Sequence, residues 1–123
     1  MQVQGTKSEQ PQVLSASTLC SDSVVNPSGE SLGKIEELMI DLGSGRVAYA
    51  VLSFGGFLGV GNKLFAVPFE ALDLDTDEKR FVLDIPKDKL EHAPGFDKNH
   101  WPDFADRGFG REVYGYYDVP TYW

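Results

Sequence analysis

The chain has 123 residues, 41% of them hydrophobic and 24% charged, which are ordinary values for one globular domain with a single sizeable core. Its 19 acidic and 11 basic residues give a net charge of −8, which disfavours nucleic acid and anionic lipid as direct partners because both are negatively charged. No run of residues is apolar enough to cross a bilayer, and the first residues lack the apolar core of a signal peptide. Together with the single cysteine, Cys20, which cannot form an internal disulfide, these features predict a cytoplasmic protein with no membrane span.

The chain divides into three regions by composition. Residues 1–17 are polar and rich in glutamine and serine, which predicts a disordered tail. Residues 18–93 consist of short apolar runs separated by turn residues, and this rhythm predicts an all-β domain. Residues 94–123 hold 9 of the 15 aromatic residues on a backbone rich in glycine and proline, and we expect this extension to pack on the β domain or on a second subunit.

Turn signals mark the hairpins of the predicted β domain. Asn26–Gly29 (NPSG) and Gly43–Gly45 (GSG) should each close a hairpin, because proline presets φ and glycine accepts positive φ. The run RVAYAVLSF, residues 46–54, is rich in β-branched and aromatic residues and predicts a strand covered on both faces. Further strand-like runs flank a charged turn at Asp75–Lys79, and Lys87–His92 predicts a short helical turn between two prolines.

The segment LGKIEELMIDL is ambiguous between a helix and a strand. Its apolar residues fall at helical spacing: Leu32, Ile35, Leu38, Met39 and Leu42. Gly33 within the segment, and the turn signal directly after it, favour a strand in a hairpin instead. Periodicity alone leaves the two alternatives nearly balanced.

The glycine-rich stretch FGGFLGVGNKLFAVP resembles a phosphate-binding loop only superficially. In such a loop the lysine directly follows the last glycine and a helix begins behind it. Here one residue separates Gly61 from Lys63, and the run that follows is β-like. We therefore expect a tight crossing between two strands, with Phe57 and Leu58 at the tip of the loop.

No group of residues forms a recognisable catalytic or cofactor-binding arrangement. The string GESLG matches a nucleophile elbow at Ser31, but that elbow works in large strand–turn–helix sheets that exceed the length of this chain. Cys20 has no neighbouring cysteine or base, and the spacing of His92 and His100 fits no zinc site. The sequence therefore predicts no catalytic residues, no cofactor and no bound metal.

A cluster of carboxylates imitates the spacing of a calcium loop. Asp73, Asp75 and Asp77 alternate along the chain. Asp84 stands at the twelfth position, but Glu78 occupies the sixth position, where the sharp turn of such a loop needs glycine. A solvated hairpin turn accounts for these residues, and a weak cation site is the alternative.

The extension offers four further aromatic side chains of interest: Phe96, Trp101, Phe104 and Phe109. They could anchor a partner or a second copy of the chain, because aromatic residues are enriched in interface cores. They could equally cap an open end of their own domain. The candidate interaction site combines Trp101 with Phe57 and Leu58 of the glycine-rich stretch.

Two long segments carry a family resemblance: VVNPSGESLGKIEELMIDLGSGRVAYAVLSFGGFLGVGNKLFAVPFEALDLD and FVLDIPKDKLEHAPGFDKNHWPDFAD. Over about residues 18–107 they resemble the PRC-barrel domain, a family named for the photosynthetic reaction centre. The resemblance implies a small, strongly bent β-barrel of about six strands. It also implies that LGKIEELMIDL is a strand and that the glycine-rich stretch is a loop between strands.

Members of this family act by contacting other proteins: one is the cytoplasmic domain of the reaction-centre H subunit, and another is the carboxy-terminal domain of a ribosome maturation factor. This chain looks like the stand-alone bacterial kind, with an extension marked by APGFD and WPDFAD. The resemblance therefore implies a non-catalytic protein–protein interaction module, which we expect to form a homodimer and to bind a protein that the sequence does not identify. The alternatives are a cation- or small-ligand-responsive barrel that uses the carboxylates, and a ribosome-associated factor by family analogy.

Overall fold

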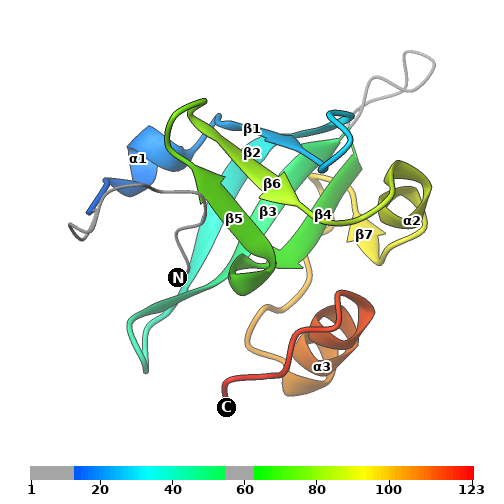
Figure 1. The fold of residues 1–123 in the computed structure, drawn as a ribbon. Coiled ribbons are helices and arrows are strands. Elements are labelled where there is room, and N and C mark those ends of the chain that lie inside the picture. Colours follow the sequence, from blue (N-terminus) through cyan, green and yellow to red (C-terminus); the bar gives the residue numbers. More distant parts are fainter. Residues whose placement is uncertain (1–12, 55–62) are drawn as a thin grey trace.

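The computed structural model describes residues 13–54 and 63–123, and in these ranges the chain is mostly β (Figure 1). Seven strands form one sheet in the order β5-β6-β1-β2-β3-β4-β7. The strands are β1 (Ser23–Val25), β2 (Ser31–Asp41), β3 (Arg46–Phe54), β4 (Lys63–Pro68), β5 (Leu72–Asp75), β6 (Arg80–Leu83) and β7 (Gly95–Phe96). The helical elements are α1 (Ala16–Leu19), the 3-10 turn η2 (Phe69–Ala71), α2 (Lys87–Glu91) and α3 (Arg107–Tyr116). The predicted short helical turn is confirmed as α2.

Both predicted hairpin turns are also confirmed. β1 and β2 pair antiparallel around the NPSG turn, where the Asn26 backbone N–H donates to the Glu30 carbonyl oxygen at 3.0 Å. The Asn26 side chain fixes this turn, because its Nδ2 group donates to the Ile85 carbonyl oxygen at 3.2 Å. The second turn joins β2 to β3, and there the Gly45 N–H donates to the Asp41 carbonyl oxygen at 2.7 Å.

The ambiguous segment is a strand, β2, and not a helix. It pairs with β1 on one side and β3 on the other, so the hydrogen bonds of a sheet replace those of a helix. Gly33 is required here, because its φ of +107° lies in the left-handed region and a Cβ at this position would overlap the Ser53 carbonyl oxygen of β3. Register shifts near Glu37 and Ile40 interrupt the β2–β3 ladder, and such bulges bend a strand.

The sheet bends so that the β5–β6 hairpin lies across β3 and β4 (Figure 1). The buried core between them takes side chains from both layers, among them Leu74, Phe81, Leu52, Phe65 and Val67. β1 and β6 pair in parallel, whereas the other ladders of the described residues are antiparallel. No ladder among these residues joins the edge strands β5 and β7, so the sheet is open. The sequence led us to expect a barrel of about six strands, and the structure differs in two ways: the sheet has open edges, and it has a seventh strand. The seventh strand is the two-residue β7, which pairs with β4 at one edge.

Like α1 and β7, the ten-residue helix α3 is an element that sequence reasoning missed. It begins after Asp106, whose side chain caps it by accepting a hydrogen bond from the Gly108 N–H at 2.8 Å. Three glycines among its ten residues lower its intrinsic helix propensity and so hide it in the sequence. Packing stabilises the helix instead, because Val113 and Tyr114 are buried in a second apolar cluster with residues of β3 and β4.

Candidate functional site

Trp101 lies in the described part of the chain, whereas the other two predicted interaction residues, Phe57 and Leu58, lie outside it. The Trp101 side chain is 40% exposed, and its Nε1–H donates to the Lys98 carbonyl oxygen at 2.9 Å. Its ring packs against that of Phe96, with 5.2 Å between the centroids. The indole is therefore held in one orientation with much of its apolar surface exposed, as an interface anchor requires.

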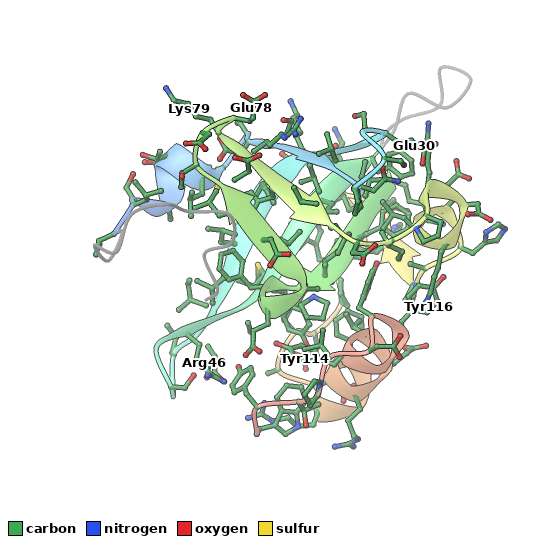
Figure 2. All side chains as sticks on the ribbon, viewed as in Figure 1. Glu30, Arg46, Glu78, Lys79, Tyr114 and Tyr116 are labelled. Carbon is green, nitrogen blue, oxygen red and sulfur yellow. The ribbon has the colours of Figure 1, made fainter. Side chains whose placement is uncertain are left out.

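Trp101 stands at the edge of a cluster of aromatic rings that connects the extension to β3. Tyr49 of β3 contacts three rings of the extension at centroid distances of 5.2, 6.0 and 5.6 Å: Phe104, Phe109 and Tyr114. The Tyr114 hydroxyl also donates to the Ala48 carbonyl oxygen at 2.7 Å, a buried bond where α3 meets the sheet (Figure 2). These rings pack within one chain and fix the extension on the sheet.

A groove of about 560 Å³ opens beside this cluster, and we call it the tail groove. One wall is the end of β2 with the turn that follows it, and the other is the segment that leads into α3. The lining comprises residues 39–43, Ala48, Tyr49, residues 102–107, Tyr122 and Trp123. The tail groove therefore forms only where the extension meets the β2–β3 hairpin.

Tyr122 ties the segment after α3 to the β2–β3 hairpin. Its hydroxyl donates to the Asp41 side chain at 2.5 Å, and this bond is the main reason why the pKa of Asp41 lies below its usual range. The Arg46 guanidinium lies 4.5 Å from the centre of the Tyr122 ring, a cation–π contact. These contacts shape one side of the tail groove and keep Asp41 ionised at neutral pH.

The other carboxylates of the tail groove lie on the segment that leads into α3. Asp103 accepts a hydrogen bond from the Ala105 N–H at 3.0 Å, and Asp106 caps α3, so each uses one carboxylate oxygen within the chain. The cation of the lining, Arg107, lies 4.6 Å from the centre of the Trp123 ring. Three carboxylates against one guanidinium make the tail groove acidic.

The Tyr49 side chain is only 3% exposed, yet it lines the tail groove. Its hydroxyl makes no hydrogen bond to a described residue, and burial raises its pKa to about 12, so the group is neutral at physiological pH. Tyr114 differs, because its buried hydroxyl has the Ala48 carbonyl oxygen as a partner. Gly110 of α3 lies against this region, since a Cβ there would come within 2.8 Å of the Tyr49 hydroxyl and 2.7 Å of the Trp123 ring.

The motifs that imitate catalytic sites lie in strands. Ser31 and Gly33 both belong to β2, so GESLG is not the strand–turn–helix elbow that a nucleophile needs. Lys63 begins β4, which is a strand where a phosphate-binding loop needs a helix.

Cys20 is no reactive nucleophile either. Burial is the main cause that raises the pKa of its thiol, and nearby carboxylates raise it further, so the reactive thiolate is disfavoured.

The candidate metal ligands bond to their neighbours. Asp73 and Asp75 lie in β5, and Asp75 pairs with Arg80 of β6 at 3.6 Å. His100 bonds through Nδ1 to the Asp97 side chain at 2.8 Å. Among residues 13–54 and 63–123, no group of three or more histidine, cysteine or carboxylate side chains is placed to hold a metal ion.

Sequence reasoning identified the aromatic extension but not the tail groove. The bond between Asp41 and Tyr122 joins residues far apart in the chain, and no local pattern brings them together. One signal was present: Ile40 and Leu42 place exposed apolar groups at a hairpin end, and exposed apolar groups of this kind mark contact surfaces.

Comparison with known proteins identifies the β domain. No curated protein matches the chain. No helix in the described residues is both long and apolar enough to span a membrane. The model of the PRC-barrel domain family matches residues 11–90, a range that includes strands β1 to β6. Since this match covers more than half of the chain, the chain belongs to the PRC-barrel domain family.

Proposed function

We propose that the chain is a non-catalytic protein–protein interaction module that acts in the cytoplasm and forms a homodimer. Its contact surface is centred on Trp101 and includes Phe57 and Leu58. The Trp101 ring carries this proposal, because a large apolar side chain that is fixed yet 40% exposed is the kind of group that protein partners bury. The net charge of −8 favours a basic protein surface over nucleic acid as a further partner.

In this proposal, residues 18–93 form the barrel domain and residues 94–123 provide the contact surface. The packing of Tyr114 and Val113 on the sheet supports it, because a fixed extension presents its exposed rings without a large loss of entropy on binding. Neither the cation-responsive nor the ribosome-associated alternative has a supporting observation in the described residues.

Light scattering tests the proposed function. Trp101→Ala should convert a dimer into a monomer, because interface cores lose most of their binding energy when a central aromatic residue is truncated. Leu14→Ala is the matched control, since Leu14 is also exposed (45%) but lies beside α1, outside the extension. If Trp101→Ala leaves both the mass and the capture of partners unchanged, the contact surface is elsewhere and the proposal is wrong.

A further inference from the structure

The tail groove is where exposed apolar side chains gather. Six large hydrophobic side chains are exposed in the described residues, and three of them line this groove: Ile40, Leu42 and Trp123. Leu42 is 91% exposed, in the turn between β2 and β3. Covering such side chains with the apolar groups of a ligand is favourable, because apolar surface leaves water.

The charges of the tail groove select against anions. Its lining contains three aspartates and one arginine, and that arginine already lies on the Trp123 ring. The rings of Phe104 and Tyr122 line the same groove, and aromatic faces attract cations. A ligand that combines a cation with apolar groups therefore fits the groove better than a phosphate or a carboxylate.

The Tyr49 hydroxyl offers a ligand of the tail groove a hydrogen-bond donor. Tyr49 lines the tail groove, and no described residue is seen to bond to its hydroxyl, so this group can donate to a ligand in the groove. A ligand with a hydrogen-bond acceptor would satisfy it. A peptide offers such an acceptor at every residue, in its backbone carbonyl oxygen.

We propose that the tail groove binds an extended segment of a partner protein in which arginine or lysine stands between apolar residues. The apolar side chains of that segment pack on Leu42, Ile40 and Trp123, and its cation lies near Asp103 and Asp41. A backbone carbonyl oxygen of the segment accepts the hydrogen bond of Tyr49. This site adjoins the Trp101 surface at Phe104 but is separate from it, so the inference goes beyond the proposed self-association.

The probe for this proposal is a short dye-labelled peptide of alternating leucine and arginine. Its binding to the full chain is measured by fluorescence anisotropy at physiological salt. The control peptide carries citrulline in place of every arginine, which removes the charge and keeps the shape. The arginine peptide should bind at least about tenfold more tightly, because charge-assisted hydrogen bonds and cation–π contacts both need the cation.

Three variants locate the binding. Tyr49→Phe should weaken peptide binding by about three- to tenfold without lowering the thermal midpoint, because the hydroxyl that it removes has no partner within the described residues. Asp103→Asn should weaken binding by a similar factor, while its amide oxygen can still accept from the Ala105 N–H. Glu78→Gln removes the same charge from the β5–β6 turn, at the opposite end of the molecule from Tyr114 in Figure 2, and should leave the affinity unchanged.

Several results would overturn the proposal. Equal binding of the arginine and citrulline peptides would show that no cation is recognised, and equal losses in Asp103→Asn and Glu78→Gln would show attraction to net charge alone. A fall of the dimer mass in the Tyr49 variant would make a second copy of the chain the occupant. Light scattering of Trp101→Ala keeps the two proposals apart, because that variant tests self-association whether or not the peptide binds.

Discussion

The Tyr114 hydroxyl joins α3 to β3 through its buried hydrogen bond to the Ala48 carbonyl oxygen. Tyr114→Phe should lower the free energy of unfolding by about 1–2 kcal/mol, because the carbonyl oxygen then loses a partner away from water. Urea unfolding followed by circular dichroism measures this change. Tyr49→Phe is the matched control, since it removes a hydroxyl from the same cluster that has no partner in the described residues and should change stability by less than about 0.5 kcal/mol. Equal losses in the two variants would contradict the assignment of the Tyr114 bond.

Cys20 offers a second test at the scale of one side chain. Burial raises the pKa of its thiol, and Glu37, Glu36 and Asp22 raise it further, so little thiolate is present at neutral pH. We expect the folded chain to react with a disulfide reagent several times more slowly than the urea-unfolded chain. Because the sequence contains one cysteine, the released chromophore reports this group alone. A folded-state rate equal to the unfolded one would show that the thiol is freely accessible and unperturbed.

At the scale of one element, the glycines of α3 have opposite roles. A Cβ on Gly110 would come within 2.7 Å of the Trp123 ring and 2.8 Å of the Tyr49 hydroxyl, whereas Gly115 has open space around it. Gly115→Ala should raise the free energy of unfolding by roughly 0.5–1 kcal/mol, because alanine favours a helix. Gly110→Ala should lower it, because Trp123 or the helix must move. Thermal unfolding of the two variants checks the pair, and stabilisation of both would mean that α3 does not pack closely on Tyr49.

The same helix shows where prediction from the sequence failed and why. The hairpin turns were predictable because Asn26–Gly29 and Gly43–Gly45 carry local turn chemistry that fixes the backbone directly. α3 was not, because three glycines among its ten residues lower its helix propensity, whereas its buried residues Gly110, Val113 and Tyr114 show their role only once they pack on the sheet. For β2, periodicity left helix and strand nearly balanced, and the strand implied by the family resemblance is confirmed because pairing with β1 and β3 determines the outcome there.

At the scale of the whole molecule, burial of several tyrosines makes stability depend on pH. Burial raises the pKa of Tyr49 to about 12 and also raises those of Tyr114 and Tyr117, whereas tyrosines of an unfolded chain ionise near pH 10. Above about pH 10 the unfolded chain loses protons that the folded chain keeps, so the free energy of unfolding should fall as the pH rises toward 12. Urea unfolding at a series of pH values measures the slope.

Tyr114→Phe provides the control for this pH dependence. It removes one of the buried ionisable groups and should therefore make the fall of stability above about pH 10 shallower, even though it lowers stability at neutral pH. A free energy of unfolding that stays constant from about pH 10 to 12 would contradict the burial of these tyrosines.

The mostly β character and the family could be predicted, but the open edges of the sheet could not. Local sequence patterns predict the longer strands and their turns. The seventh strand, in contrast, consists of Gly95 and Phe96 and pairs with β4 through only two residues. No periodicity can be detected over so short a run. The tail groove escaped prediction for a related reason, because it depends on contacts between the β2–β3 hairpin and residues near the other end of the sequence.

The parallel ladder between β1 and β6 bears on the order in which the chain folds. β2, β3 and β4 can pair with neighbours in sequence as soon as they leave the ribosome, but β1 lacks its second neighbour until β6 has been made. Closing this ladder brings together Ser23 and Arg80 at the cost of the entropy of the long intervening segment. We therefore expect docking of the β5–β6 hairpin to be a late and slow step of folding, and Val24 of β1, which is fully buried in the final structure, to be covered only at that step.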